Sequence, residues 1–172
     1  LLLSAYLHDI GMTPSLSKVK AIQEILIDGK SVTLSETERK KLQHWLDEQD
    51  SDFELGVDKY LTENFEGHKN LYQTIKYYCR ERHNDWSGEW IDENLKDIKI
   101  ENYTNWQEDL KNVCKSHHYG FTDLMNSKFD ALPIIENKVV NLRYLALCLR
   151  MADVLENDPE RTPDVIFQDI CH

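Results

Sequence analysis

The chain has 172 residues, of which 41% are hydrophobic and 30% charged, and its formal net charge is −11. This length and balance predict one folded domain with a sizeable core and argue against disorder. The acidic balance argues against a large surface for duplex nucleic acid, because affinity for the phosphate backbone comes from Lys and Arg. A small phosphorylated ligand is still compatible, since a bound metal reverses the local charge of an acidic protein.

Neither a membrane segment nor a secretion signal is expected. No apolar run approaches the roughly 20 residues of a membrane span. The opening Leu-rich stretch also lacks a basic region and a cleavage site. The four cysteines lie far apart, without a Cys-x-x-Cys pair, at positions 79, 114, 148 and 171. We expect reduced thiols in a cytoplasmic protein, and neither a disulfide framework nor a zinc knuckle.

Helices account for nearly all of the predicted elements. In chain order they are expected over residues 1–9, 17–28, 35–45, 53–62, 69–84, 89–96, 104–116 and 138–156. Apolar residues recur in most of these stretches at helical spacing, and Gly or Pro follows several of them as a stop signal. Stretches 32–34 and 98–100 are too short to count as strands. The sequence therefore predicts an all-α bundle of about seven or eight helices in one domain over residues 1–172.

Two four-residue segments have the pattern of a capping box, which marks the N-terminus of a helix. Ser35-Glu-Thr-Glu38 and Thr104-Asn-Trp-Gln107 each place Ser or Thr three residues before Glu or Gln. In such a box both side chains bond to backbone N–H groups of the first turn. We expect a helix to begin at each box.

An adjacent His8-Asp9 pair stands at the end of the opening apolar run. A His-Asp dipeptide alone is common by chance and carries little information. Imidazole and carboxylate groups that converge from several buried helices, however, suit a divalent metal that hydrolyses phosphates. Three further candidate ligands follow downstream: His83, His117 and Asp153.

Asp153 lies on the apolar face of the last predicted helix. At 100° per residue, its direction differs by about 20° from that of Leu142 and by about 40° from that of Leu149. A carboxylate in such a place is costly unless it is paired or bound to a metal. A salt bridge to Arg143 or Arg150 is one interpretation. Metal ligation is the other, and the accompanying motifs favour it.

His83 and His117 each continue an apolar stripe at helical spacing. His83 follows Cys79 by four residues, and His117 follows Val113 by four. A lone His on an apolar face is usually a hydrogen-bonded core residue, but two of them beside a His-Asp pair favour ligation. His118 points about 100° further round the helix. It is a candidate for contact with the substrate, with plain surface exposure as the alternative.

Three arginines are candidate phosphate contacts, because guanidinium binds phosphate oxygens in a bidentate manner. The alternative is an ordinary role in covering apolar surface or pairing with one of the 31 acidic residues. The three are Arg82, Arg150 and Arg161.

These segments resemble the HD-domain phosphohydrolases, a helical superfamily with the pattern His, then His-Asp, then Asp. Ala5–Met12 is similar to the central motif and Leu149–Glu156 to the helix of the final Asp. Arg80–Ser87 and Cys114–Gly120 are similar to the extra histidine segments of members that hold two metals. The first His of the family lies on a helix before the central motif. We therefore expect this chain to be a fragment that lacks the first helix.

The resemblance implies a metal-dependent phosphohydrolase that acts on a phosphomonoester or phosphodiester, with a nucleotide as the expected substrate. It implies a first metal held by His8, Asp9 and Asp153. A second metal, bridged by Asp9, would bind His83 and His117. The expected cofactors are one or two ions of Mn, Fe, Co, Ni or Zn, and Mg is also compatible. Asp9 and His118 are the candidate catalytic residues.

Absent motifs narrow the resemblance. Met12 and Tyr119-Gly-Phe replace the Lys and the Gly-Tyr-Pro segment of the HD-GYP hydrolases of cyclic di-GMP. The remaining resemblance is to HD modules of bacterial multidomain proteins, joined to a chaperone-type ATPase module and associated with defence. We expect a small phosphorylated substrate and an attached ATPase domain as partners, without duplex nucleic acid or membrane. The alternative function is a non-catalytic sensor module that binds metal or nucleotide and signals to the ATPase domain.

Overall fold

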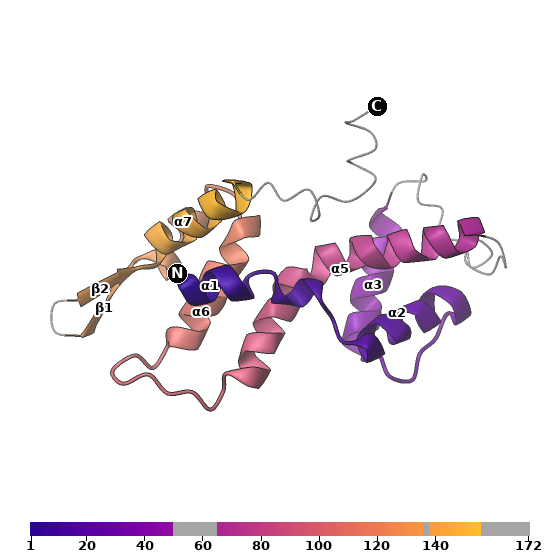
Figure 1. Cartoon of the computed structure of the whole chain (residues 1–172), viewed down its shortest axis with the longest axis horizontal. Coiled ribbons are helices and arrows are strands. Elements are labelled where there is room, and N and C mark those ends of the chain that lie inside the picture. Colours follow the sequence, from indigo (N-terminus) through magenta and orange to yellow (C-terminus); the bar gives the residue numbers. More distant parts are fainter. Residues whose placement is uncertain (50–64, 136–137, 156–172) are drawn as a thin grey trace. The chain divides into compact units, whose positions relative to one another are not determined.

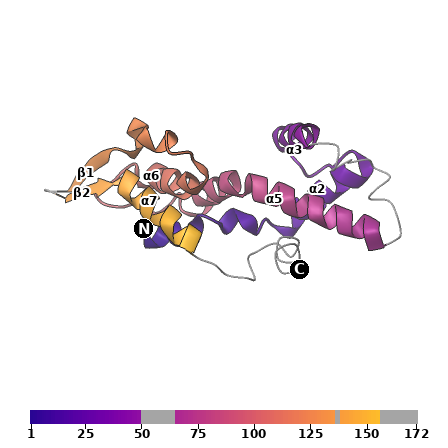
Figure 2. The same ribbon diagram turned by 90° about the horizontal axis from the view of Figure 1, so that it is seen from above.

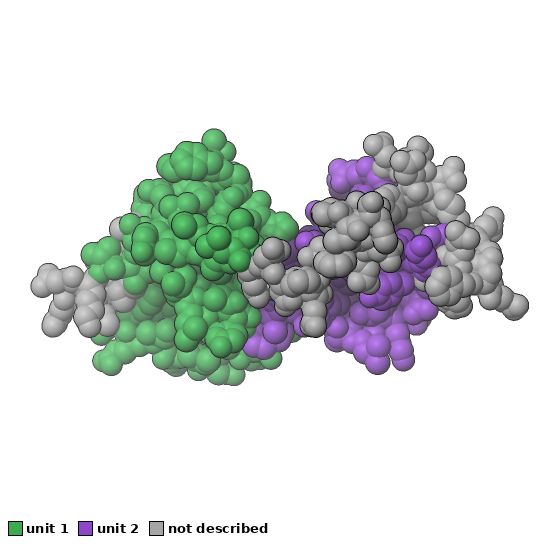
Figure 3. Space-filling view, turned by 45° about the horizontal axis from the view of Figure 1, so that its top comes forward, with its two compact units in different colours: residues 1–8, 91–172 green, residues 9–90 purple. Residues whose placement is uncertain are grey.

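The computed structural model of the chain describes residues 1–49, 65–135 and 138–155. The chain divides into two compact units, coloured separately in Figure 3. Unit 1 combines Leu1–His8 with Ile91–His172, and unit 2 comprises Asp9–Trp90. The assignment of one domain to residues 1–172 stays a prediction.

The all-α class is confirmed for the described residues (Figure 1). They contain six α-helices, fewer than the seven or eight predicted, and the helix predicted over 53–62 lies outside them. The helices are α1 (Leu2–Leu7), α2 (Leu16–Asp28), α3 (Glu36–Glu48), α5 (Phe65–Asn94), α6 (Trp106–Lys115) and α7 (Leu142–Leu155). The described residues also contain one β-hairpin, which lies between α6 and α7 in the chain and consists of β1 (Ala131–Ile135) and β2 (Lys138–Asn141).

Unit 2 consists of α2, α3 and most of α5 around one apolar core. The hydroxyls of Ser15 and Ser35 cap α2 and α3 by accepting the N–H groups of Lys18 and Glu38. Gly29 ends α2 in the left-handed conformation, with φ of 71°, as its place after the apolar stripe predicts. Residues at helical spacing from the three helices fill the core: Ile22, Leu26, Leu42, Leu71, Tyr78, Cys79 and Trp86.

Helix α5 is continuous where the sequence predicts two helices, over 69–84 and 89–96. Gly88 costs about 1 kcal/mol relative to Ala inside a helix. Trp86 lies two residues before Gly88 in the same helix and is only 3% exposed. Burial of a large apolar side chain contributes about 2 kcal/mol or more, which outweighs that cost and explains why the helix continues.

Unit 1 contains α1, α6 and α7, and α6 contacts both of the other helices (Figure 2). Its core is formed by Val113, Leu124, Phe129, Leu142, Ala146 and Leu149. The capping box predicted at Thr104–Gln107 is wrong, because α6 begins at Trp106 with Asn105 as N-cap and no side-chain cap bond. Trp106 is buried, and the helix starts one residue later than the box requires.

Residues 138–141 form β2, which pairs with β1 in antiparallel register, and not the start of the last helix. Val139 and Val140 are β-branched, which favours a strand over a helix. Asn141 then caps α7, because its Oδ1 accepts the N–H of Tyr144 at 2.9 Å. The boundary between strand and helix therefore falls at an Asn cap.

The described cysteines fit the expectation of reduced thiols. Cys79, Cys114 and Cys148 are free, whereas position 171 lies outside the described residues. Burial raises the pKa of the Cys79 thiol to about 11 and that of Cys114 to about 12. Both thiols are therefore protonated at neutral pH and behave as apolar core groups.

A buried ion pair joins α3 to α5 in unit 2. Arg82 Nε donates to Glu38 Oε1 at 3.1 Å, and the Tyr78 hydroxyl donates to the same oxygen at 2.8 Å. Burial alone would raise the pKa of Glu38. The hydrogen bonds from Arg82 and Tyr78, together with nearby positive charge, have the larger, opposite effect, so the pKa lies below its ordinary value of 4.5. The capping box at Ser35–Glu38 is therefore only half formed: Ser35 caps the helix, and the carboxylate of Glu38 binds α5.

Arg82→Met should lower the free energy of unfolding at pH 7 by about 3–5 kcal/mol, because it leaves the Glu38 carboxylate buried without its cation. Urea unfolding followed by circular dichroism measures the loss. Pairing holds the pKa of Glu38 below its unfolded value, so the penalty is complete above about pH 5 and shrinks as the pH falls through the folded value. Arg39→Met, on the exposed side of α3, should change stability by less than about 0.5 kcal/mol. Equal losses in the two variants would contradict the assignment.

Candidate metal centre

His8 directly follows α1 and is 6% exposed. Its ring Nδ1 donates to the carbonyl of Ala5 at 2.9 Å, which fixes the ring against its own helix. The opposite ring nitrogen, Nε2, lies 3.6 Å from Oδ1 of Asp153. His8, at the end of α1, and Asp153, near the end of α7, therefore face each other within unit 1.

Asp153 continues the stripe of α7 as the sequence predicts. Leu142, Ala146 and Leu149 precede it at spacings of four, three and four residues, and all three are buried. The Asp153 side chain is 34% exposed, so it lies where this stripe reaches the surface. The structure pairs it with His8 and gives Arg143 a different carboxylate, that of Asp130.

Asp9 and His83 form a second pair, within unit 2. Nε2 of His83 lies 3.3 Å from Oδ1 of Asp9. His83 is 4% exposed on α5, and its Nδ1 donates to the carbonyl of Arg80. The His-Asp dipeptide thus sends its two side chains to different partners, and the peptide bond between them is also the junction of the two units.

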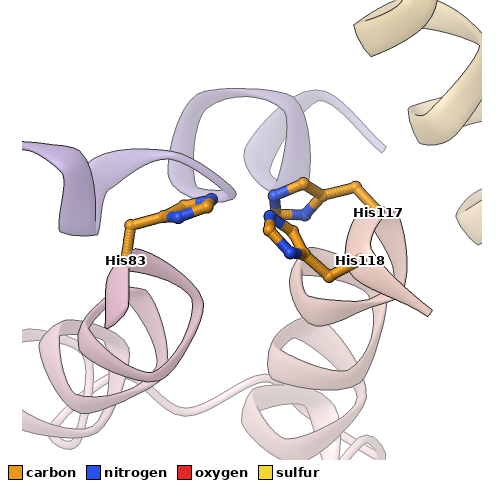
Figure 4. Close-up of side chains that lie close together, drawn as sticks. All are labelled: His83, His117 and His118. Carbon is orange, nitrogen blue, oxygen red and sulfur yellow. The ribbon is translucent and has the colours of Figure 1, made fainter. Parts of the chain in front are cut away.

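His117 and His118 occupy the 3-10 turn Ser116–His118 that follows α6. Figure 4 shows their rings side by side, and their centroids lie 4.5 Å apart. The same view shows His83 rising from α5. Nδ1 of His117 donates to the carbonyl of Cys114, and its ring packs edge-on against that of His8 at 5.0 Å. His118 is exposed, so a role in substrate contact stays a prediction.

The three histidines His8, His83 and His117 share one hydrogen-bond pattern. In each, Nδ1 contacts the backbone carbonyl three residues earlier. A carbonyl only accepts, so Nδ1 carries a proton in each ring, and Nε2 is the nitrogen available to a metal ion. Metal-ligating histidines use their second nitrogen in this way, which fixes the tautomer and raises the basicity of the ligand. The residues present therefore fit a divalent ion.

The donor atoms restrict which metal ions the centre suits. His and Asp side chains in the described residues form groups that could hold a metal ion. Imidazole nitrogen and carboxylate oxygen without thiolate suit Mn, Fe, Co, Ni or Zn and do not select one of them.

The predicted arginines have other contacts. Arg82 is buried in its pairs with Glu38 and Asp85. Arg150 donates to the carbonyl of Ser116 at 3.4 Å and to that of Tyr119. It thereby ties α7 to both ends of the turn that carries His117 and His118. The third candidate, Arg161, lies outside the described residues.

Ser87 is a residue of this region that the sequence reasoning missed. It is 0% exposed on α5, and its hydroxyl accepts the N–H of Gly11 at 2.9 Å. Gly11 stands two residues after Asp9, and Ser87 stands one helical turn after His83. Ser87 falls between the helices predicted over 69–84 and 89–96, so its place one turn after His83 became apparent only from the continuous α5.

A family model described as HD-CE matches residues 1–170, almost the whole chain. The chain belongs to the HD-CE family. The resemblance to HD-type domains is thereby confirmed. No curated protein and no solved structure matches the chain. Within the described part of this HD-CE domain, no helix is long and apolar enough to cross a membrane.

Asp9→Ala and Asp153→Ala should each remove most bound metal while the circular dichroism spectrum stays helical. Loss of a direct ligand should weaken binding by more than the roughly 10–100-fold that supporting residues typically cost. Plasma mass spectrometry of dialysed protein gives the metal content. Asp130→Ala, which removes an exposed carboxylate paired with Arg143, is the control and should keep its metal. Wild-type metal content in either ligand variant would remove that residue from the site.

Proposed function

We propose that the HD-CE domain is a metal-dependent phosphohydrolase that acts on a phosphomonoester or phosphodiester, with a nucleotide as its substrate. The observation that carries this proposal is the pair of His–Asp contacts on either side of one peptide bond. His8 pairs with Asp153 at 3.6 Å, and Asp9 pairs with His83 at 3.3 Å. Each pair combines an imidazole nitrogen with a carboxylate oxygen, the donor set of a hydrolytic metal ion.

Each ligand has a separate task in this proposal. His8, Asp9 and Asp153 would hold one ion, and Asp9, His83 and His117 would hold the second, as the family resemblance implies. A bound divalent ion supplies Lewis acidity toward phosphate oxygens and lowers the pKa of a coordinated water. The Nδ1–H bonds of the histidines hold the rings in place, so that the ligands need little rearrangement when substrate binds.

Asp9 and His118 are the residues proposed to act on the reactants. The carboxylate of Asp9, 24% exposed, can accept a proton from the attacking water. His118 is exposed beside His117 and can contact the leaving group or another phosphate oxygen. The phosphate-binding role is proposed for Arg150 and Arg161. The charge of Arg82 is balanced by two carboxylates in unit 2, whereas Arg150 donates to neutral backbone carbonyls that leave its charge available to a phosphate.

The acidic charge of the chain supports a small substrate over duplex nucleic acid. We also propose that the domain works beside an attached ATPase domain in a longer protein of the cytoplasm. Such an arrangement would couple hydrolysis to the state of the neighbouring domain. The alternative, a sensor that binds without turnover, differs only in the chemical step.

Turnover should depend on the metal and on Asp9. Release of phosphate from p-nitrophenyl phosphate, bis-p-nitrophenyl phosphate and nucleotides is measured with Mn, Co, Ni, Zn or Mg and after chelation. We expect turnover with at least one transition metal, and its fall to the chelated level in Asp9→Asn, because the amide is a weaker ligand and a poorer base.

Asp130→Asn is the matched control for this assay, since it changes an exposed carboxylate outside the two pairs. Its turnover should equal that of the wild type. Tight metal binding without hydrolysis of any substrate would overturn the enzymatic proposal in favour of the sensor. Turnover that survives chelation would contradict the role of the metal.

A further inference from the structure

The turn after the His-Asp dipeptide makes two separate contacts with one face of α5. Asp9 reaches His83, and Gly11 donates its backbone N–H to the hydroxyl of Ser87 at 2.9 Å. His83 and Ser87 stand four residues apart and so lie one above the other on the helix. Both contacts lie within unit 2.

The second contact is unusually close to the helix backbone. A Cβ added to Gly11 would lie 2.1 Å from the carbonyl oxygen of His83 and 2.7 Å from the nitrogen of Ser87. No side chain fits there, so the turn lies directly on the main chain of α5. Glycine at this position is thus required by close approach to α5.

The position of Gly11 also constrains the backbone of Asp9. The 3-10 turn Ile10–Met12 follows Asp9 directly, and the N–H of Met12 donates to the carbonyl of Asp9 at 2.8 Å. Fixing Gly11 therefore fixes the backbone two residues before it. The direction of the Asp9 carboxylate toward His83 depends on that backbone.

We propose that Ser87 is a positioning residue of the metal centre, which holds the Gly11 turn so that Asp9 and His83 present their ligand atoms together. This inference rests on the proposed function. Without the hydroxyl, the buried N–H of Gly11 loses its acceptor, and an unsatisfied buried donor favours movement of the turn toward water. Asp9 then moves relative to His83, and the metal loses a well-placed ligand pair.

Ser87→Ala tests the inference against Thr74→Val as a matched control. Thr74 is also buried on α5, 2% exposed, and its hydroxyl donates to the carbonyl of Asn70 at 2.9 Å, within the same helix. Zn²⁺ affinity of the full chain is measured by competition with a chromogenic chelator. We expect Ser87→Ala to bind Zn²⁺ about 10–100-fold more weakly, as for other residues that orient ligands. Thr74→Val should bind as the wild type does.

Amide hydrogen exchange on the metal-free proteins gives a readout that does not depend on the metal. The Gly11 amide should exchange faster in Ser87→Ala than in the wild type or in Thr74→Val. Gly11→Ala, which forces the turn off the helix, should give the same two changes. Faster exchange with unchanged Zn²⁺ affinity would show that the contact exists but does not position the ligands, and this would overturn the inference.

The outcomes separate this inference from the proposed function. If the wild type binds Zn²⁺ and Ser87→Ala binds it equally well, the metal centre stands and the role of Ser87 is wrong. If the wild type binds neither Zn²⁺ nor any other divalent ion, both the proposed function and the positioning role fail. Equal losses of affinity in Ser87→Ala and Thr74→Val would mark a general effect of weakening α5 and would also overturn the inference.

Discussion

The hydrogen bond from a histidine Nδ1 to the carbonyl three residues earlier is the interaction on which the candidate centre depends. It occurs at His8, His83 and His117, on three different stretches of helix or helix end. At each place the bond stays within one local segment, so the tautomer and the ring orientation are set by local backbone. The tertiary structure then brings a carboxylate to the Nε2 side of His8 and of His83.

The two units provide that carboxylate in different ways. In unit 1, the apolar stripe of α7 ends in Asp153, which packing places against His8. In unit 2, the turn after Asp9 is seated on α5 through Gly11 and Ser87, beside His83. The buried Arg82–Glu38 pair fastens the same helix to α3. A guanidinium that the sequence offers as a phosphate ligand thus serves the stability of the scaffold.

Local patterns were sufficient to predict much of the fold. Gly29 and Ser35 mark helix ends because φ preference and capping act within a few residues. The same reasoning failed where tertiary contacts compete. Helix α5 continues past Gly88 because the side chain of Trp86 is buried. The carboxylate of Glu38 pairs with Arg82 on α5 and therefore does not complete the capping box of α3. The hairpin β1–β2 pairs two segments whose register no single stretch reveals.

The sequence predicted candidate ligands but not which of them contact one another. Spacing indicated that Asp153 shares the stripe of Leu149, and the structure bears this out. Which histidine faces which carboxylate depends on contacts between residues 74 to 145 positions apart, and these do not follow from periodicity. Ser87 was missed because a hydroxyl that accepts from a backbone N–H leaves no pattern of its own.

Nitrogen-15 NMR of the histidine rings during titration with Zn²⁺ tests the central claim most directly, because it reports each ring nitrogen separately. The account predicts that Nδ1 carries a proton in metal-free His8, His83 and His117. It also predicts that Zn²⁺ shifts their Nε2 resonances and leaves Nδ1 protonated. Rings without a proton on Nδ1, or Nε2 resonances that do not respond to Zn²⁺, would contradict it.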